Sequence, residues 1–456
     1  MIGATPSEIK QMLSAIGIGA IDELFSDIPE EVKLKKGLKV PPAMSEQELR
    51  RSFSELAKKN LALADQTSFL GAGVYRHDIP SAVKALISRG EFATAYTPYQ
   101  AEASQGTLQS IYEFQTLICK LVGMDVANAS HYDGATSLAE AALMALDITG
   151  KENLLVSRAV HPHYRQVVGT YFHGRNLPIK ETPLFEGLTS TEEVEAYLSK
   201  NPTAALLVQY PNFLGLLEPL EALASICKKH GTLLVVAVVE PVALGLLKPP
   251  GERGASIVAG EGQSLGIPPS FGGPHVGFIA TTKEYMRRIP GRLVGQTLDS
   301  KGKLAYTLTL QAREQHIRRE KATSNVCTNQ SLCAVANAIY LSLLGKEGFK
   351  EVSAQCYHKA HYAFRQWTKT GALKPLFNAP FYHEFVLRTP IKASEFMNLM
   401  EKEKILSGYP LTQDYPEFGD AILLTVTEVN RREEIDCFTR KLEEAPRLTR
   451  EGCLHG

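Results

Sequence analysis

The sequence has no excess of charge of either sign. Among its 456 residues, 49 are lysine or arginine and 49 are aspartate or glutamate, so the formal net charge is zero. Proteins that bind nucleic acid or anionic membranes usually carry a surplus or a cluster of basic residues. The composition therefore disfavours both classes, and we expect partners that are small molecules or neutral protein surfaces.

Long apolar runs are also absent. No run of about eighteen apolar residues occurs, which disfavours a membrane-spanning helix. Residues 1–8, Met-Ile-Gly-Ala-Thr-Pro-Ser-Glu, lack the basic and apolar regions of a secretion signal. We therefore expect a cytoplasmic protein.

Paired cysteines are missing as well. The seven cysteines are scattered along the chain, and no two of them form a Cys-x-x-Cys pair. This spacing argues against a disulfide framework and against a cysteine-rich metal site. We expect reduced cysteines that act as small hydrophobic residues, and no metal centre.

The length predicts two or three domains, and a hydrophobic content of 44% is enough for a large core. Residues 1–65 are predicted to form an N-terminal helical arm. Thr5-Pro-Ser-Glu8 and Ser45-Glu-Gln-Glu48 are typical helix starts, and the prolines between them exclude a single long helix.

Residues 66–340 alternate short apolar runs with helical patterns. The predicted strands are 154–156, 204–208, 233–239 and 276–280, and the predicted helices include 135–145 and 220–229. Runs that are apolar on both faces predict a parallel-rich sheet covered by helices, hence a large α/β domain. Ligands of such sheets bind at the carboxyl ends of the strands.

Residues 341–456 are predicted to form a small C-terminal α+β domain and a tail. Strands are expected at 381–387 and 421–426, and helices at 394–404 and 431–443. Asn430 is the expected N-cap of the last helix, with Glu433 at its third position. Residues 445–456 are expected to be loose.

The most informative absence is that of one lysine. The strand 233–239 ends at Glu240, and the loop 260–275 that follows the next apolar run carries Gln263. Aminotransferase-like enzymes use an acid and a lysine at such positions to hold pyridoxal phosphate: the acid pairs with the pyridine nitrogen, and the lysine forms a Schiff base with the aldehyde. Gln263 has no amine, and the nearest lysines in sequence, Lys248 and Lys283, lie outside the loop.

Other polar residues near these strands have two interpretations each. Gly134 and Ala135 precede a helix and could hold a phosphate on free N–H groups, but an ordinary helix start is favoured. His161, in a His-Pro-His loop, is more readily explained as a structural histidine. Glu240 needs a partner if it is buried, such as a backbone N–H or an arginine.

Two further segments are candidates for contacts with other groups. The stretch from Arg313 to Lys321 mixes basic and acidic residues and predicts a helix with a solvated face and intrahelical pairs. The loop Tyr96-Thr-Pro-Tyr99 offers two tyrosines for interface packing, or for hydrogen bonds to a phosphate or a carboxylate.

Several segments together resemble the glycine cleavage P-protein, a pyridoxal-phosphate glycine decarboxylase, and most of all its lysine-less, alpha-type subunit 1 in the two-chain form. The segments that carry this resemblance are 94–100, 104–106, 113–116, 123–130, 132–136, 272–275, 313–325 and 327–330.

The resemblance implies an aminotransferase-like fold, that of the fold type I transferases that depend on pyridoxal phosphate. It places Gln263 at the Schiff-base lysine, Glu240 at the acid that pairs with the pyridine nitrogen, and His161 at the ring-stacking histidine. The residues that cradle the phosphate fall on Asp133-Gly-Ala-Thr136, so Gly134, Ala135, His161, Glu240 and Gln263 would form a degenerate cofactor pocket.

The resemblance also implies a partner chain. A lysine-bearing subunit 2 would hold pyridoxal phosphate covalently and decarboxylate glycine, and the aminomethyl group would pass to the lipoyl arm of the H-protein. This chain alone would be inactive, with no catalytic residue of its own. It would line the partner's site with Tyr96, Thr97, Tyr99, Ser324 and Asn325. The alternatives are an autonomous pyridoxal-phosphate enzyme and a noncatalytic binding or regulatory protein on this fold.

Overall fold

The computed structural model describes the backbone of residues 3–452 and the side chains of residues 3–444. The chain divides into two compact units, Met1–Leu61 and Ala62–Gly456. No helix in the described part of the chain is both long and apolar enough to cross a membrane.

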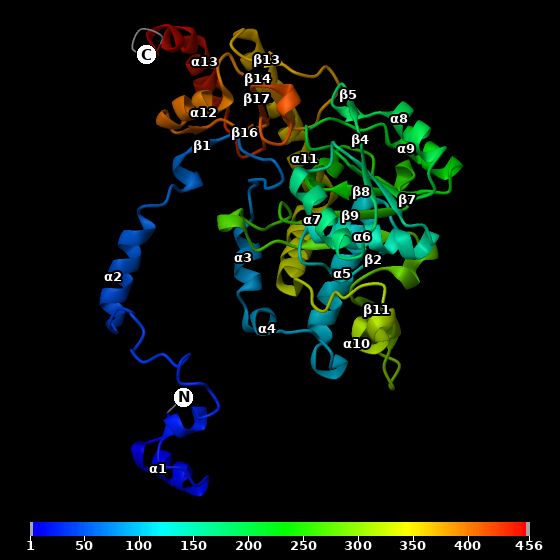
Figure 1. The fold of residues 1–456 in the computed structure, drawn as a ribbon. Helices are drawn as coiled ribbons and strands as arrows, with labels where there is room; N and C mark the ends of the chain where they lie inside the picture. The colour runs from blue at the N-terminus through cyan, green and yellow to red at the C-terminus, as the bar shows by residue number, and fades with distance from the viewer. Residues whose placement is uncertain (1–2, 453–456) are drawn as a thin grey trace. The chain divides into compact units, whose positions relative to one another are not determined.

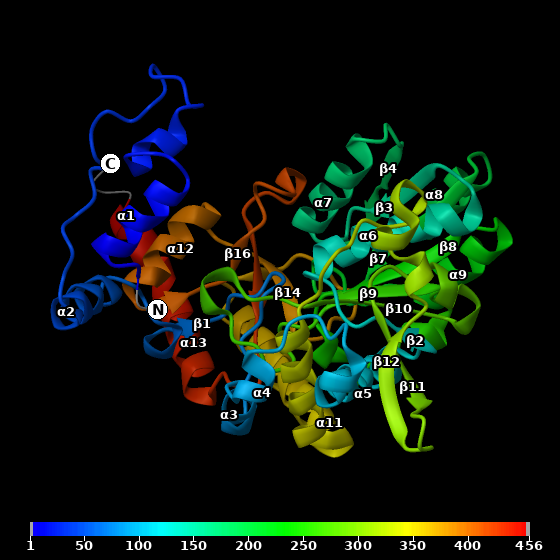
Figure 2. The same ribbon diagram turned by 90° about the horizontal axis from the view of Figure 1, so that it is seen from below.

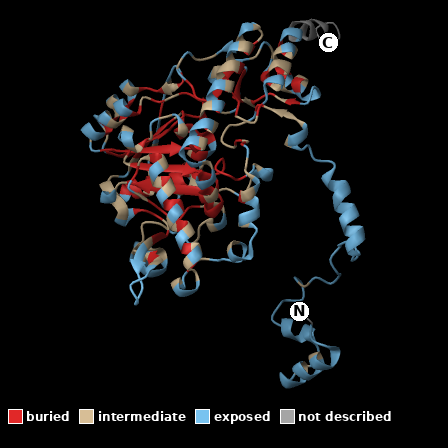
Figure 3. Cartoon of the chain, turned by 180° about the vertical axis from the view of Figure 1, so that it is seen from behind, coloured by how far each residue is buried: buried red, intermediate tan, exposed pale blue. Residues whose placement is uncertain are grey.

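The first unit contains three short helices: α1 (Pro6–Ala15), η1 (Ile21–Phe25) and α2 (Glu46–Ala57). The two predicted capping boxes are confirmed, because Thr5 and Ser45 each accept a hydrogen bond from the N–H three residues later. None of the three helices contains a buried residue. The pale blue colour of the N-terminal helices in Figure 3 shows this exposure.

The second unit is built on a seven-stranded sheet with the strand order β2-β10-β9-β8-β7-β3-β4. The central strands pair in parallel, whereas β10 is antiparallel to both of its neighbours. The predicted parallel-rich sheet is therefore confirmed, although residues 276–280 contribute its antiparallel strand. The strands are β2 (Val126–Ala127), β3 (Asn153–Ser157), β4 (Ile179–Thr182), β7 (Thr203–Gln209), β8 (Leu233–Val238), β9 (Ile257–Glu261) and β10 (Gly277–Thr281).

Helices cover both faces of this sheet (Figures 1 and 2). On one face, alternate residues such as Leu206 and Val236 pack in a core with α5, α8, α9 and α11. On the other face, their neighbours Leu207 and Val235 pack with α6 and α7. Strands buried on both faces explain why the sequence shows apolar runs rather than alternation. The helices are α5 (Gln105–Val122), α6 (Gly134–Thr149), α7 (Pro162–His173), α8 (Thr191–Leu198), α9 (Leu220–Lys229) and α11 (Ser331–Lys369).

A four-stranded antiparallel sheet with the order β13-β14-β17-β16 forms the C-terminal part and has its own core. Buried aromatic side chains such as Phe69, Trp367 and Phe438 contact one another in that core. The elements are β13 (Lys374–Pro375), β14 (Glu384–Arg388), α12 (Ala393–Lys402), β15 (Ile405–Leu406), β16 (Tyr409–Pro410), β17 (Ala421–Thr425) and α13 (Arg432–Gly452).

The remaining elements are short. They are β1 (Thr67–Ser68), paired with β15, the hairpin β11 (Leu293–Leu298) and β12 (Leu304–Thr309), the pair β5 (Leu184–Phe185) and β6 (Leu188–Thr189), and the helices α3 (Ser81–Ile87), α4 (Gly90–Ala93), α10 (Gln315–Arg318), η2 (Leu63–Asp65), η3 (Ala101–Ala103), η4 (Pro241–Gly245), η5 (Gly251–Arg253), η6 (Ser270–Gly272), η7 (Lys283–Arg288), η8 (Gln311–Arg313), η9 (Arg319–Lys321) and η10 (Pro416–Phe418).

Two predictions for the C-terminal part are wrong in detail. Helix α13 begins at Arg432, one residue after the predicted start. The Asn430 side chain accepts from the N–H of Thr427 instead of capping the helix, and Glu434 accepts from the N–H of Arg431. The predicted loose tail is helical as far as Gly452, and residues 453–456 lie outside the described residues.

The predicted helix from Arg313 to Lys321 is also wrong. The segment breaks into η8, α10 and η9, and Arg319 has a φ of 54°, which interrupts a helix. The half-buried side chain of Arg313 donates to the carbonyl of Ile289 instead of pairing along a helix surface. Tertiary contact therefore overrides the local helical pattern.

Candidate functional site: a filled cofactor pocket

The residues expected in the degenerate cofactor pocket lie at the carboxyl ends of the central strands. Glu240 follows β8, Gln263 follows β9, and His161 precedes α7 beyond the end of β3. Gly134 is the first residue of α6. The adjacency of β3, β7, β8 and β9 in the sheet brings these positions to one edge, as the sequence predicts.

Gln263 is buried, with 1% of its surface exposed, and its amide group is paired with the chain itself. Its Oε1 accepts from the N–H of Tyr75 at 2.9 Å. Its Nε2 donates to the carbonyls of Tyr75 at 3.1 Å and Ile267 at 2.6 Å. A lysine has no acceptor and could not make this two-way pairing. The glutamine is thus a structural clamp on the segment that contains Tyr75.

Glu240 is also buried and has three partners. One carboxylate oxygen accepts from the N–H of Val242 at 2.8 Å and from Ser264 Oγ at 3.0 Å, and the other lies 3.3 Å from His77 Nε2. Both carboxylate oxygens of Glu240 are therefore engaged by groups of the chain itself. The sequence correctly predicts that Glu240 needs a partner, but it does not identify the histidine.

His77 lies between two carboxylates, because its Nδ1 is 2.7 Å from Glu428 Oε2. Burial by itself lowers the pKa of His77. The charge of Glu240 and hydrogen bonds with Cys356, Glu240 and Glu428 outweigh that effect and raise the pKa of His77 well above its ordinary value. Burial raises the pKa of Glu428, but the hydrogen bond and charge of His77 bring it below its ordinary value. The cluster is a charged hydrogen-bonded network inside the protein.

The donor atoms of His77, Cys356 and Glu428 lie within 4.8 Å of one another, which is a possible arrangement for a metal. Two ligands of one tetrahedral zinc ion lie about 3.3 Å apart, given bond lengths near 2.0–2.1 Å. The separation of 2.7 Å between His77 and Glu428 is instead a hydrogen-bond distance. Hydrogen bonding therefore accounts for the cluster.

His161 has both ring nitrogens engaged. Nδ1 accepts from the N–H of His163 at 3.1 Å, so the ring hydrogen lies on Nε2, which donates to the carbonyl of Ala72 at 2.9 Å. Burial lowers the pKa of His161 to about 4, and the ring is neutral near pH 7. The ring stacks on Tyr164 with a centroid distance of 5.1 Å. These contacts agree with the structural interpretation of His161 that the sequence favours.

The N-terminus of α6, where a phosphate would bind, holds a carboxylate of the chain. Glu261 Oε2 accepts from the N–H of Gly134 at 2.9 Å, and Oε1 accepts from the N–H groups of Gln263 and Val276. Asp133 caps the same helix by accepting from the N–H of Thr136 at 2.7 Å. The anion that a helix N-terminus attracts is thus supplied internally.

One segment, Gly71–Asp78, occupies the pocket and will be called the filling segment. Its Ala72, Tyr75 and His77 contact His161, Gln263 and Glu240 respectively. Glu384 anchors the segment from β14, accepting from the N–H of Ala72 at 2.8 Å and from the hydroxyl of Tyr75 at 2.7 Å.

The glycines of the filling segment permit this close approach. A Cβ on Gly71 would lie 1.9 Å from Thr425 Oγ1, and a Cβ on Gly73 would lie 2.7 Å from His161 Nε2. Gly73 also has a φ of 104°, which favours glycine. Pyridoxal phosphate does not fit here, because the N–H of Gly134 and the side chains of His161, Glu240 and Gln263 are already paired inside the protein. Lys248 and Lys283 are exposed and lie outside the pocket, which argues against an autonomous enzyme.

The predicted partner-site residues lie in two surface loops. Tyr96, Thr97 and Tyr99 follow α4, and both tyrosines are exposed. Ser324 and Asn325 precede α11, and Ser324 Oγ accepts from the N–H of Val326 at 3.1 Å. The buried guanidinium of Arg292 joins the two loops, since Nη2 donates to the Tyr99 hydroxyl at 2.7 Å and to the carbonyl of Cys327. The sequence did not single out Arg292.

Comparison with known proteins agrees with this geometry. The family model for the glycine cleavage system P-protein matches residues 1–442. The chain is 52% identical to the probable glycine dehydrogenase (decarboxylating) subunit 1 of Moorella thermoacetica, over 95% of this chain and 97% of that protein. It is 50% identical to the protein of the same name from Brevibacillus brevis, over 97% and 98% of the two chains.

Comparison with solved structures also finds a P-protein of the glycine cleavage system. A crystal structure of glycine decarboxylase (P-protein) of the glycine cleavage system, in inhibitor-bound form, is 40% identical, covers 97% of this chain and 99% of that one, and has a TM-score of 0.87. A cysteine desulfurase from Thermococcus onnurineus, at 14% identity and a TM-score of 0.60, shares the fold, with coverage of 89% and 99%. The fold is that of the fold type I enzymes that depend on pyridoxal phosphate, and the chain belongs to the glycine cleavage system P-protein family.

Proposed function

We propose that this chain is the lysine-less subunit of a two-chain glycine decarboxylase. Support comes first from the pairing of Gln263 with Tyr75 inside a filled pocket. If a chain of this family cannot hold the cofactor itself, any contribution it makes to glycine decarboxylation is made at a site in another chain. The relatives named subunit 1 support the presence of a second subunit.

In this proposal the partner subunit carries the Schiff-base lysine and the pyridoxal phosphate. When bound there, the cofactor supplies the electron sink for loss of carbon dioxide from glycine, and the aminomethyl product passes to the lipoyl arm of the H-protein. The present chain supplies no bond-breaking group. Its role is to complete and preorganise the partner's site, which contributes to catalysis through geometry.

The loop Tyr96–Tyr99 is the part of the chain that we propose to reach the partner's site. Both tyrosines are exposed, although such rings usually find cover in an assembled protein. Ser324 and Asn325 belong to the same surface, since Arg292 ties the Tyr99 hydroxyl to the carbonyl of Cys327. A tyrosine hydroxyl can donate to a phosphate or a carboxylate while its ring packs at the interface.

Substitution of the two tyrosines tests the proposal. The chain and the lysine-bearing subunit would be co-expressed, and glycine–bicarbonate exchange would be measured with lipoylated H-protein. Because a hydrogen bond to a charged group contributes about 1.5–3 kcal/mol, we expect Tyr96→Phe or Tyr99→Phe to lower exchange about tenfold to a hundredfold. Sedimentation and melting temperature control for assembly. Wild-type chains that assemble without exchange activity would favour a noncatalytic regulatory protein instead.

A further inference from the structure

Arg292 is a buried cation that has only neutral partners among the described residues. The residue is 5% exposed, and its guanidinium bonds are to the Tyr99 hydroxyl and the Cys327 carbonyl. Its Nε is buried without an acceptor. Burying a charge without a counter-charge is unfavourable, so an arginine at this position calls for an explanation beyond packing.

The backbone around Arg292 is held firmly. The carbonyl of Arg292 accepts from the N–H of Ala129 at 2.8 Å, and the carbonyl of Pro290 accepts from the Asn128 side chain at 3.0 Å. On the other side, the Gln115 side chain on α5 pairs with both backbone groups of Val294, at 2.9 and 3.0 Å. The guanidinium is therefore placed from the body of the large sheet and its helices.

Arg292 fixes the direction of its hydrogen bond with Tyr99. Arg292 is a donor only, so the Tyr99 oxygen is the acceptor, and the hydroxyl hydrogen of Tyr99 is left free to point elsewhere. The guanidinium also lies over the ring, with Cζ 5.3 Å from its centroid. A phenol that accepts from a cation is polarised and becomes a better donor. The Tyr99 residue is exposed, so a partner can reach this side chain.

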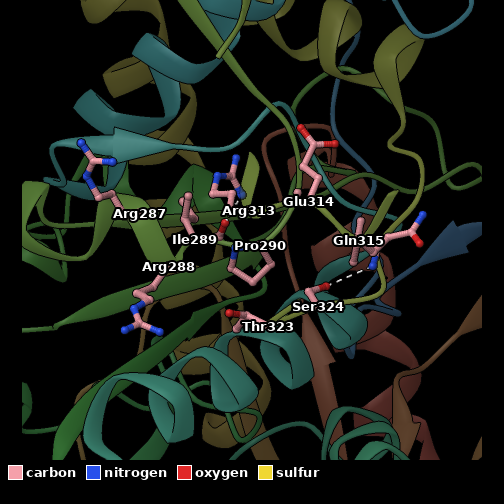
Figure 4. A pocket seen from close by; sticks show the side chains of 11 residues that line it. Arg287, Arg288, Ile289, Pro290, Arg313, Glu314, Gln315, Thr323 and Ser324 are labelled. Carbon is pink, nitrogen blue, oxygen red and sulfur yellow. Dashed lines mark hydrogen bonds between the residues drawn. The ribbon is translucent and has the colours of Figure 1, made fainter. Parts of the chain in front are cut away.

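Arg313 provides a contrast. Its Nε and Nη2 are buried without partners, and it lines a small cavity with Ile289, Glu314 and Ser324 (Figure 4). The cavity volume is about 20 Å³, which is room for one water molecule and too little for a phosphate or a carboxylate ligand. Arg313 therefore has no room beside it for such a ligand, whereas Arg292 donates to the hydroxyl of an exposed tyrosine.

We propose that Arg292 is a positioning residue that directs the Tyr99 hydroxyl to donate to an anionic oxygen in the partner's site, either the cofactor phosphate or the glycine carboxylate. This inference rests on the proposed function. Arg292 itself touches neither ligand, because its bonds are to Tyr99 and Cys327. The guanidinium is required because one nitrogen must serve two acceptors in a fixed plane while the group covers a ring.

A double-mutant cycle on the co-expressed complex tests the inference. The variants are Arg292→Met, Tyr99→Phe and the double variant, with Arg292→Lys as a milder change. Arg287→Met is a matched control, since Arg287 is exposed and its side chain points away from Arg313 in Figure 4. Glycine–bicarbonate exchange, the KM for glycine, the affinity of the complex for pyridoxal phosphate and the sedimentation of each complex would be measured.

We expect Arg292→Met to lower exchange tenfold to a hundredfold in assembled complexes, and to change it less than threefold when Tyr99 is already phenylalanine. A raised KM for glycine identifies the carboxylate as the acceptor, and weakened pyridoxal phosphate binding identifies the phosphate. The inference would be overturned if the losses of exchange caused by Arg292→Met and Tyr99→Phe multiply in the double variant. Full activity of both Arg292 variants would also overturn it. If the complex with Arg292→Met fails to assemble, the inference is tested with Arg292→Lys instead. Exchange by this variant is then compared between chains that carry Tyr99 and chains that carry Tyr99→Phe. An inactive wild-type complex would instead count against the proposed function.

Discussion

At the scale of single residues, polar contacts within the chain fill the pocket at the ends of the central strands. The side chain of Gln263 forms two hydrogen bonds with the backbone of Tyr75 in the filling segment and one with the carbonyl of Ile267 in its own loop. An amide suits this position because it both donates and accepts, as a backbone group does. The role of Gln263 in this structure is therefore to hold the filling segment.

Restoring the lysine should not restore an enzyme. Gln263→Lys leaves the N–H of Tyr75 without its acceptor and buries an ammonium group, so we expect a loss of about 3 kcal/mol or more in the free energy of unfolding. Treatment with pyridoxal phosphate and borohydride, followed by peptide mapping, should find no pyridoxyl lysine at position 263 of the variant, whereas the exposed Lys283 can react non-specifically in both forms. Gln263→Met is the control for loss of the hydrogen bonds without a charge. Glycine decarboxylation by the lysine variant alone would contradict this account.

Glu384 should give the chain a recognisable dependence on pH. Burial raises the pKa of this carboxyl to about 7, above its ordinary value of 4.5. The folded state then binds one more proton than the unfolded state between these values, so stability falls as pH rises from 4.5 to 7 and levels off above that. A shift of this size corresponds to about 3 kcal/mol at 1.36 kcal/mol per pH unit.

The variant Glu384→Gln isolates this effect. Its amide oxygen can keep the bonds from Ala72 and Thr425, and its NH₂ can donate to the Tyr75 hydroxyl, but the side chain no longer titrates. Urea unfolding at pH 5 and pH 8 should show that the variant gains up to about 3 kcal/mol relative to the wild type at the higher pH. A difference that stays constant across this range would show that Glu384 does not titrate as described.

At the scale of elements, a carboxylate of the chain itself occupies the N-terminus of helix α6. Glu261 at the end of β9 accepts from three backbone N–H groups, including that of Gly134. The positive end of the helix is thereby compensated by a strand residue. The same helix start that in a cofactor enzyme would hold phosphate here joins two elements of the core.

Removal of this carboxylate should reopen the site to anions. We expect Glu261→Ala to destabilise the chain by about 2–4 kcal/mol, because buried N–H groups lose their acceptor. Millimolar inorganic phosphate should then raise the melting temperature of the variant, while the wild type stays unchanged. Glu252→Ala, at a residue of η5, serves as the control for a lost negative charge. A wild-type chain that phosphate stabilises equally well would mean that the helix start is not closed.

At the scale of the whole molecule, the first unit carries large apolar residues that its own helices do not bury. Helices α1 and α2 contain no buried residue, although Met12, Leu49 and Phe53 are large and apolar. Surface of this kind is typical of an interface. We therefore expect a heteromeric complex, and obligate interfaces usually bury more than about 2,000 Å².

Sedimentation velocity of the chain with and without the lysine-bearing subunit tests this expectation. The full chain should form a complex, whereas a chain lacking residues 1–61 should keep its unfolding transition and bind the partner at least tenfold more weakly. The truncated chain should keep its unfolding transition because the second unit holds the hydrophobic cores. It should bind the partner more weakly because it lacks the exposed apolar residues of the arm. A full chain that stays monomeric beside the partner would refute the assembly.

The sequence by itself determined the class of fold and the place of the site. Apolar runs fixed the strands around Leu206, Val236 and Val258, and glycine or capping residues fixed the ends of α6 and α9 to within a few residues. These features are encoded over short distances in the chain, because the periodicity of a strand or a helix is local. The missing lysine at position 263 could be read from the same local pattern.

Only the tertiary structure decided which partners the polar residues of the pocket take. The bonds of Gln263 to Tyr75, of Glu240 to His77 and of Arg292 to Tyr99 join residues 188, 163 and 193 positions apart. A buried polar group must find a partner, but the sequence does not say which one, because many side chains could satisfy it. The choice is made by the packing of the sheet, which brings the filling segment against the strand ends, and by the surface loops that Arg292 holds together.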